Sequence, residues 1–384
     1  MKIIYCIAGT YNSGGMERIL ALKANYLVKQ GMEVLILTSD QRSRKPYFDF
    51  DDRIQHLDLG INYDQNHSKG VAGKALTYLK LQRLHRKRLE KVLKRNQADV
   101  VISLFDHEAN FLYDIRDGSK KILEVHFSRF KRIQYDRKGV WGWVDRWRSY
   151  NELKIARRYD RFVVLTQEDK QYWGSWPELR VIPNANSFEP ILSAALTVKR
   201  VIAVGRLDYQ KDFEQLIRIW DQVFKAHPDW MLSVFGQGPQ KNALQQLIDQ
   251  LGLQAVVHIQ EPVKEIDQEY LKSSILVLTS RYEGLPMVLL EGQACGLPMV
   301  AYACQCGPRD IIHHGENGFL IKPGDQKTFA QRLVQLIDDP ELRKLMGRRA
   351  RVLSSDYSLD NVMGQWLDVF RELCQRKEVT WPGQ

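Results

Sequence analysis

The chain has 384 residues, 44% of them hydrophobic and 27% charged, and carries a net charge of +10. This composition is typical of a globular protein, and the length exceeds what one hydrophobic core usually organises, so we expect two domains. No run reaches the ~18 apolar residues of a membrane span, and the first residues predict a buried strand instead of a secretory signal. Five cysteines without regular spacing favour a reducing cytoplasm, and Cys304-x-Cys306 lacks the second pair of a zinc site.

Strands and helices alternate along the first half of the chain. An apolar run at 2–8 is followed by a glycine turn, a helix with apolar periodicity at 16–31 and a strand at 32–39. Further short buried strands are expected at 98–105, 120–127 and 160–167. A strand-helix-strand unit of this length indicates parallel strands with right-handed crossovers.

The pattern starts again after a Pro/Asn-rich hinge at 181–190. Expected strands then lie at 199–207, 230–239, 255–261, 273–280, 297–303 and 317–323, and an amphipathic helix at 358–377. We therefore expect an α/β protein of two doubly wound, Rossmann-like domains that face across a cleft. The first comprises residues 1–186 and is joined by the C-terminal helix, 358–384, and the second comprises 190–357.

Two loops at strand ends have the chemistry of phosphate sites. Ser13-Gly14-Gly15 follows the first strand, where backbone N–H groups can approach an anion, although the loop is neither a full G-x-G-x-x-G nor a P-loop. Arg206 and Lys211 follow the first strand of the second domain, the edge at which open α/β sheets bind ligands. An Arg fork and a Lys point charge suit a diphosphate, and the alternative is a pair of solvated surface cations.

The segment EGLPMVLLE places Glu283 and Glu291 at the two ends of an apolar stretch. Pro286 suits the start of a helix, so Glu283 is expected in the loop before it and Glu291 inside it. Because the neighbours of Glu291 are apolar, we expect its carboxylate to have a polar partner, for which the hydroxyls of a ribose are suitable. The alternative is a glutamate exposed on a helix face.

The order of these motifs resembles that of the retaining glycosyltransferases of family 4, which have the GT-B fold. The E-x7-E segment is followed by A-x-G-x-P-[VM]-V, by G-P-R-D-I-I and by G-x-N-G-F-L-I, and SGGMER, VIPN, VGRLDYQKDF and VFGQGP also fit the family. The matching segments are 283–291, 294–300, 307–312 and 315–321, with 13–18, 181–184, 204–213 and 234–239.

The resemblance implies a nucleotide-sugar donor, with a UDP-sugar favoured, held mainly by the second domain. Arg206 and Lys211 would neutralise the leaving diphosphate, with Gly14 and Gly15 closing on it from the first domain. Glu291 would bind the ribose, and Glu283 would contact the donor sugar near its reacting face. Backbone groups at the helix start would meet the phosphates or the sugar, at Gly284, Leu285, Pro286, Met287 and Val288.

His126 matches a histidine that this family places beside the donor sugar, and we expect it to hydrogen-bond a sugar hydroxyl or the backbone. Together with Glu283, Arg206 and Lys211 it makes up the expected catalytic set. Asp106-His107-Glu108 would line the acceptor side, and an ordinary polar loop is the alternative there.

The implied reaction moves a sugar to a hydroxyl of a lipid-linked or cell-envelope glycan, with the acceptor attacking from the face that the diphosphate leaves. Cations and helix dipoles would stabilise the departing diphosphate. No metal or other cofactor is expected, because no Asp-x-Asp motif lies at a strand end and Arg206 with Lys211 can do the work of a metal.

Much of the positive charge lies in the first half, at 74–96 and 127–162, where it alternates with Trp141, Trp143 and Trp147. Such a surface suits the anionic cytoplasmic face of a membrane, so we expect a cytoplasmic, peripheral protein. Internal packing of the tryptophans is the alternative. A nucleic-acid-binding protein, a nucleotide-sugar epimerase and a phosphorylase are other functions, but no nucleic-acid motif and no Schiff-base lysine motif is present. The sequence leaves the donor base, the sugar and the acceptor open.

Overall fold

The computed structural model describes residues 1–63, 71–131 and 139–375, and these form two compact units. The first unit contains Met1–Leu165, Trp173–Ile182 and the chain from Val362 onward, and the second contains Thr166–Tyr172 and Pro183–Asn361. The sequence pattern had assigned residues 166–172 to the first domain, whereas they group with the second unit. The reason is local: Asp310 of the second unit accepts the backbone N–H of Gln167 at 2.6 Å, and Arg309 pairs with Glu168 at 3.0 Å.

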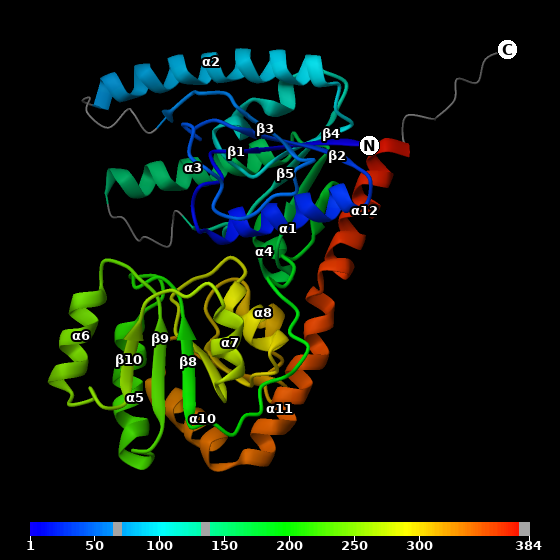
Figure 1. Cartoon of the computed structure of the whole chain (residues 1–384). Helices are drawn as coiled ribbons and strands as arrows, with labels where there is room; N and C mark the ends of the chain where they lie inside the picture. Colours follow the sequence, from blue (N-terminus) through cyan, green and yellow to red (C-terminus); the bar gives the residue numbers. More distant parts are fainter. Residues whose placement is uncertain (64–70, 132–138, 376–384) are drawn as a thin grey trace. The chain divides into compact units, whose positions relative to one another are not determined.

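A seven-stranded parallel sheet forms the centre of the first unit, in the order β3-β2-β1-β4-β5-β6-β7 (Figure 1). Its strands are β1 (Lys2–Ile7), β2 (Glu33–Thr38), β3 (Gln55–Asp58), β4 (Val100–Ser103), β5 (Lys120–Glu124), β6 (Arg161–Val164) and β7 (Leu179–Val181). Its helices are α1 (Gly15–Lys29), α2 (Val71–Asn96), α3 (Val140–Ala156) and the 3₁₀ turns η2 (His107–Asn110) and η3 (Leu112–Asp114). The order reverses between β1 and β4, which is the doubly wound arrangement that the sequence predicted.

The second unit repeats this topology with six parallel strands in the order β10-β9-β8-β11-β12-β13. The strands are β8 (Arg200–Val204), β9 (Met231–Phe235), β10 (Val257–Gln260), β11 (Ile275–Leu278), β12 (Met299–Tyr302) and β13 (Gly318–Ile321). The helices are α5 (Phe213–Ala226), α6 (Lys241–Gln250), α7 (Ile266–Leu271), α8 (Met287–Ala294), α9 (Pro308–Ile311), α10 (Gln326–Asp338), α11 (Pro340–Leu353) and the 3₁₀ turn η5 (Ser354–Tyr357). α4 (Gln167–Trp173) and α12 (Leu359–Gln375) each contain residues of both units. Here the order reverses between β8 and β11.

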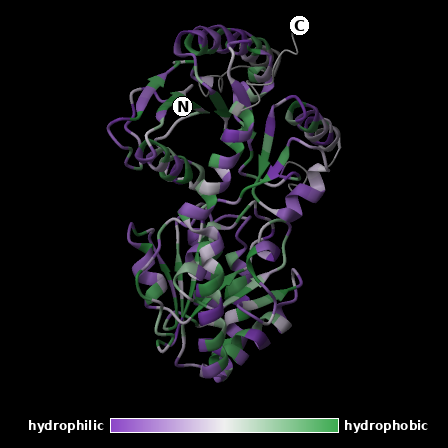
Figure 2. Ribbon diagram, turned by 90° about the vertical axis from the view of Figure 1, so that its right-hand side faces the viewer, coloured by the Kyte–Doolittle hydropathy of each residue, from purple (hydrophilic) through white to green (hydrophobic). Residues whose placement is uncertain are grey.

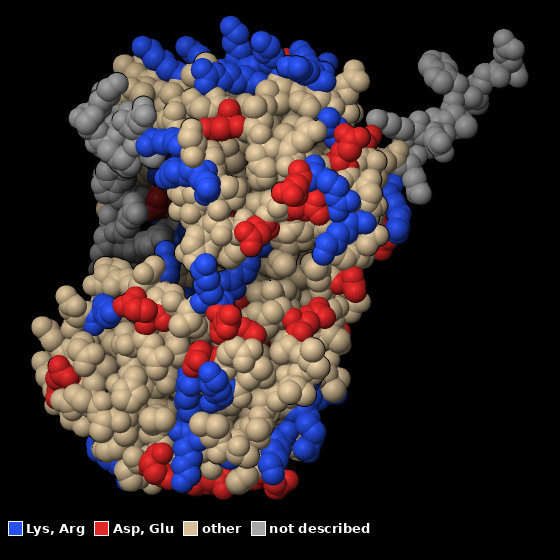
Figure 3. Space-filling model, viewed as in Figure 1, with Lys and Arg blue, Asp and Glu red and all other residues tan. Residues whose placement is uncertain are grey.

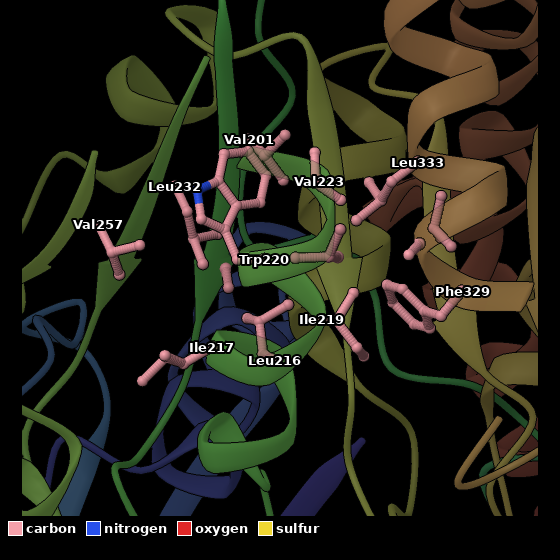
Figure 4. Packing of buried hydrophobic residues seen from close by; sticks show 14 of the residues in the cluster. Val201, Leu216, Ile217, Ile219, Trp220, Val223, Leu232, Val257, Phe329 and Leu333 are labelled. Carbon is pink, nitrogen blue, oxygen red and sulfur yellow. The ribbon is translucent and has the colours of Figure 1, made fainter. Parts of the chain in front are cut away.

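Each sheet has its own hydrophobic core. In the second unit, α5 presents Leu216, Trp220 and Val223, spaced four and three residues apart, to the buried side chains of β8 and β9 (Figure 4). Trp220 has no exposed surface, and complete burial of an aliphatic neighbour such as Leu216 contributes about 1.5–3 kcal/mol. In Figure 2 the strands are mostly hydrophobic and the helices carry polar residues on one side. Within each unit, the core fixes the positions of the strand ends.

The sequence pattern missed two edge strands, β3 and β7. All four residues of β3 are exposed and β7 has only three residues, so neither carries an apolar run. The amphipathic helix predicted at 358–377 corresponds to α12, whose buried face includes Trp366 and Phe370. No helix in the described ranges combines the length and the apolar character needed to cross a membrane.

Candidate functional site

The candidate site of the second unit lies at the carboxyl ends of β8 and β11, which pair with each other where the strand order reverses. Ligands of open α/β sheets bind at this topological switch point. Two loops leave it, one over residues 205–212 after β8 and the other over 279–286 after β11.

An ion pair joins these two loops. Lys211 Nζ lies 2.7 Å from Glu283 Oε1, and the two side chains are only 14% and 7% exposed. Gln210 donates from Nε2 to the carbonyl of Tyr282 at 3.0 Å, and Thr279 donates from Oγ1 to the carbonyl of Lys211 at 3.1 Å. The predicted Lys211 and Glu283 are therefore brought together, and hydrogen bonds between the loops hold them there.

Two glycines explain how the loops after β8 and β9 come so close. A Cβ atom at Gly236 would lie 1.9 Å from the carbonyl oxygen of Gly205, which no side chain permits. A Cβ at Gly205 would lie 3.0–3.1 Å from the stem of Lys211. Glycine is therefore required at position 236 by the backbone of Gly205, and at position 205 it leaves room for the stem of Lys211.

Arg206 occupies a different environment from Lys211. Its side chain is 75% exposed and pairs with Asp208 Oδ2 at 3.1 Å. The guanidinium has five N–H donors and is largely solvated, so donors are left over for the predicted contact with a diphosphate. The structure thus places Arg206 in the predicted loop but does not draw it into the Lys211–Glu283 pair.

The N-terminal end of α8 meets the same loops. Pro286 is the N-cap residue, directly before the helix, and the stretch from Leu285 to Gln293 is largely buried. Gly307, at φ 96°, lies against this end, and a Cβ there would come within 2.3 Å of Pro286 Cδ and 3.0 Å of the Gly284 carbonyl oxygen. A helix N-terminus carries a partial positive charge, so the expected donor-binding run from Gly284 to Val288 lies where an anion is favoured.

Glu291 is buried inside α8, with 4% of its surface exposed. Its Oε1 accepts from Ser187 Oγ and its Oε2 from the Tyr270 hydroxyl, both at 2.9 Å. The expectation of a polar partner is confirmed, and the alternative of an exposed glutamate is wrong. A carboxylate oxygen can accept more than one hydrogen bond, from protein donors or from the hydroxyl of a ligand.

In the first unit, Gly14 is the N-cap of α1 and Gly15 its first residue. A Cβ at Gly14 would lie 2.3 Å from Glu17 Oε2, and Glu17 is buried in the first turn. A carboxylate near a helix N-terminus is stabilised by the helix dipole. Glu17 therefore places a negative charge beside the position where the sequence predicts phosphate contact, a feature that the glycine pattern alone did not reveal.

His126 follows β5 closely, and its side chain is 9% exposed. Its Nε2 lies 3.2 Å from Glu124 Oε1, although the N–H does not point straight at that oxygen. The side chain of Glu124 is 2% exposed and pairs through Oε2 with Lys23 Nζ at 2.6 Å. His126 thus belongs to a buried charged cluster of the first unit.

The predicted acceptor loop, Asp106-His107-Glu108, begins η2. Asp106 accepts the backbone N–H of His107 at 2.8 Å, and the His107 ring stacks on Tyr63 with 3.8 Å between ring centres. Glu108 is buried and accepts from Ser103 Oγ at 2.6 Å. Burial, and next the charge of Asp106, raise the pKa of Glu108 to about 7. Glu108 therefore points into the protein, and His107 is the more exposed member of the loop.

Sequence reasoning missed several residues that shape the site, namely Thr279, Gln210, Tyr270 and Ser187. Gln210 lies within the motif VGRLDYQKDF, so its amide was a signal that the sequence offered. Ser187 and Tyr270 are 104 and 21 residues from Glu291, and no pattern in the sequence connects them to it. Within the described part of the chain, no group of three or more His, Cys, Asp or Glu side chains is placed to hold a metal ion.

Two family models match consecutive parts of the chain. "Glycosyltransferase Family 4" matches residues 13–186 and "Glycosyl transferases group 1" matches residues 187–353. An uncharacterized glycosyltransferase of Haemophilus influenzae is 29% identical over 95% of this chain and 98% of its own length.

Two further proteins are similar over nearly the whole chain. The first is a Campylobacter jejuni enzyme named GalNAc-alpha-(1->4)-GalNAc-alpha-(1->3)-diNAcBac-PP-undecaprenol alpha-1,4-N-acetyl-D-galactosaminyltransferase, 24% identical over 97% of this chain and 99% of that enzyme. The second is a mutant of S. aureus TarM, solved in complex with Fondaparinux, alpha-GlcNAc-glycerol and UDP. Its structure matches with a TM-score of 0.77 at 16% identity, over 96% of this chain and 99% of that chain.

The two doubly wound units, together with these matches, define a glycosyltransferase with the GT-B fold. Within this class, the chain belongs to glycosyltransferase family 4. Both the fold class and the family predicted from the motifs are thereby confirmed, as is the prediction of a sugar-transferring enzyme.

Proposed function

We propose that this enzyme is a retaining hexosyltransferase that moves a sugar from a UDP-sugar to a hydroxyl of a lipid-linked or cell-envelope glycan. The observation that carries the proposal is the buried Lys211–Glu283 pair at the switch point of the second sheet, beside the N-terminal end of α8. A UDP donor is supported by the UDP in the TarM complex. A lipid-linked acceptor is supported by the undecaprenol-linked substrate in the name of the C. jejuni relative.

The diphosphate is the part of the donor that the site suits best. Lys211 supplies a mostly buried positive charge, and the N-terminal end of α8 adds oriented backbone dipoles. A charge placed before the reaction stabilises a leaving group more strongly in a site shielded from water. Arg206, which is 75% exposed, would add a second cation.

The two glutamates would bind different ends of the donor. Glu291, deep in α8 and held by Ser187 and Tyr270, would accept from the ribose hydroxyls. Glu283 would contact the transferred sugar next to the phosphate that Lys211 neutralises. In the first unit, His126 would hydrogen-bond a hydroxyl of the reacting sugar.

The reaction would proceed without a metal ion, because Lys211 and the helix dipole supply the positive charge that a metal otherwise provides. As the diphosphate leaves, the anomeric carbon becomes oxocarbenium-like and the acceptor hydroxyl attacks on the same face, with a diphosphate oxygen taking its proton. We expect turnover to persist in EDTA. A complete loss of turnover that added metal restores would contradict this part.

A donor-hydrolysis and transfer screen across nucleotide sugars tests the proposal. Glu283→Ala and Lys211→Ala should each lower turnover of the best donor about 100-fold or more, as removal of one preorganised electrostatic group does elsewhere. The matched control is Lys199→Ala, which breaks an exposed ion pair with Asp229 just before β8 and β9, at the opposite edge of the same sheet. Full turnover in both site variants would show that the site is misplaced.

The acceptor proposal includes contact with an anionic membrane surface. Exposed cations line α2 and are crowded together in Figure 3, at Lys80, Arg83, Arg86, Lys87, Arg88, Lys91, Lys94 and Arg95. On α3, Trp143, Trp147 and Tyr150 are 74%, 65% and 57% exposed at spacings of four and three residues, so they share one helix face. Exposed aromatic side chains beside cations suit the interface of an anionic bilayer. The alternative of tryptophans packed internally is wrong for these two.

A further inference from the structure

We propose that Glu124 is a positioning residue, which holds a proton on Nε2 of His126 and so leaves Nδ1 of that ring to meet a hydroxyl of the reacting sugar. The inference rests on the proposed role of His126, and it adds a residue that no motif of the sequence singled out. It concerns the first unit alone and involves α1, β1, β5 and α12.

The side chains of Glu124 and His126 lie on the same side of the chain. Glu124 ends β5 and His126 follows two positions later on chain that continues the sheet, since the N–H of Val125 bonds the carbonyl of Val163. Side chains two residues apart on extended backbone point to the same side. This brings Glu124 Oε1 to 3.2 Å from His126 Nε2, with side chains 2% and 9% exposed.

The second oxygen of Glu124 faces a compensating charge. Lys23, from α1, places Nζ 2.6 Å from Oε2, and its side chain is 3% exposed. Its ammonium also lies 3.6 Å from the ring centre of Trp366 on α12 and 5.6 Å from that of Tyr5 on β1. Aromatic faces attract cations, so the buried lysine is stabilised on several sides.

These contacts keep Glu124 ionised. Burial alone would raise the pKa of Glu124, but the nearby charge of Lys23 opposes burial most strongly, and the pKa is lowered to about 2. Burial, and next the charge of Glu124, raise the pKa of Tyr5 well above its ordinary value, so Tyr5 stays neutral. An ionised carboxylate can only accept hydrogen bonds. Of the two nitrogens of His126, the one facing Glu124 must therefore carry a proton.

The protonation state of the other ring nitrogen, Nδ1, follows from that of Nε2. In the neutral ring with Nε2–H, Nδ1 is a hydrogen-bond acceptor. Both ring nitrogens are buried without a well-aligned hydrogen bond, and of the two it is Nε2 that faces Glu124 Oε1, at 3.2 Å. A buried polar atom without a partner costs free energy unless a ligand or water meets it. The hydroxyl of a sugar is a donor that fits Nδ1, and a fixed tautomer would present the lone pair before the sugar binds.

The first test measures the tautomer directly. The ¹⁵N imidazole shifts of His126, assigned by comparison with His126→Ala, report which nitrogen carries the proton. We expect Nε2 to be protonated in the wild type. In Lys23→Met/Glu124→Gln, which removes both charges of the pair so that neither is left buried alone, we expect a mixture of tautomers. A wild-type ring protonated only on Nδ1, or an unchanged spectrum in the double variant, would overturn the proposal.

The second test measures turnover. The double variant should lose about 10- to 100-fold in kcat with little change in KM, which is the usual effect of removing a carboxylate that orients a functional histidine in metal sites. The matched control is Asp117→Asn/Lys121→Met, which removes another buried ion pair of the same unit, with Lys121 on the same strand. An equal loss of kcat in the control would mean general destabilisation and would also overturn the proposal.

The outcomes separate this inference from the proposed function. If His126→Ala keeps full turnover, the proposed role of His126 fails and the inference fails with it. If His126→Ala loses turnover while the double variant keeps it, Glu124 is not a positioning residue and the proposed function stands.

Discussion

Lys211 and Glu283 are 72 residues apart in the chain, yet Lys211 Nζ lies 2.7 Å from Glu283 Oε1 and both side chains are mostly buried. Removing one partner leaves the other charge buried and unpaired, so Lys211→Met and Glu283→Gln should each lower the free energy of unfolding by about 3–5 kcal/mol. The double variant should lose less than the sum of the two. Urea unfolding of the four proteins measures this cycle.

The exposed pair of Lys199 and Asp229 is the control for that cycle. Its side chains are 59% and 52% exposed, so the solvent screens this pair and its removal should change the free energy of unfolding much less than a change at Lys211 or Glu283. If the losses at Lys211 and Glu283 simply add, the two charges do not stabilise each other in solution.

The hydroxyl of Tyr270 should matter for donor binding. Tyr270 is fully buried and donates to Glu291 Oε2, so Tyr270→Phe removes a hydrogen bond to a charged group, worth about 1.5–3 kcal/mol. If Glu291 binds the ribose, the variant should raise KM for the donor with kcat largely unchanged. Steady-state kinetics with varied donor decides this. A loss of stability with an unchanged KM would assign Glu291 a structural role only.

Glu108 should make stability fall as the pH rises. The ordinary pKa of this carboxyl is 4.5, and burial with the charge of Asp106 raises it to about 7 in the folded protein. The folded protein therefore keeps a proton that the unfolded chain releases. Its contribution to stability is fully present below about pH 4.5 and is lost as the pH rises to about 7. We expect Glu108→Gln to weaken this fall in unfolding free energy between pH 5 and 7.

Glu90→Gln provides the control, because Glu90 is an exposed glutamate of the same unit. A hydrogen bond from Lys94, and next the charge of that lysine, lower the pKa of Glu90, so its titration falls below this window. Equal pH profiles for the wild type and Glu108→Gln would mean that Glu108 is ionised in the folded protein.

Membrane binding should depend on the cations of α2. Arg83 and Lys87 are exposed one helical turn apart, and a cation near an anionic surface contributes about 1 kcal/mol. Arg83→Gln/Lys87→Gln should therefore weaken flotation with anionic liposomes about 30-fold. Arg218→Gln/Lys225→Gln removes two exposed cations of α5 and should float like the wild type. Flotation that does not depend on anionic lipid would rule this surface out.

Much of the fold could be predicted because each central strand is an apolar run beside a glycine turn. The edge strands β3 and β7 were not predicted, because both are short and all of β3 is exposed. Residues 166–172 group with the second unit because they contact Arg309 and Asp310. A local sequence pattern gives no information about contacts so far apart in the chain.

The candidate site was predictable where one motif held its residues together. Glu283, Glu291 and Lys211 stood in such motifs, and the structure gives each of them a polar partner. Ser187 reaches Glu291 from far along the chain, so only the fold reveals the contact. The roles proposed for Lys211, Glu283 and Glu291, like those proposed for Arg206, Gly14, Gly15 and His126, remain predictions.

Calorimetric titration with UDP tests the central claim most directly, because it needs neither the acceptor nor the identity of the sugar. We expect the wild type and Lys199→Met to bind UDP with equal affinity, and Lys211→Met to bind about 10- to 100-fold more weakly through the loss of a charge-assisted contact with the diphosphate. Absence of UDP binding to the wild type, or equal affinity in Lys211→Met, would contradict the account.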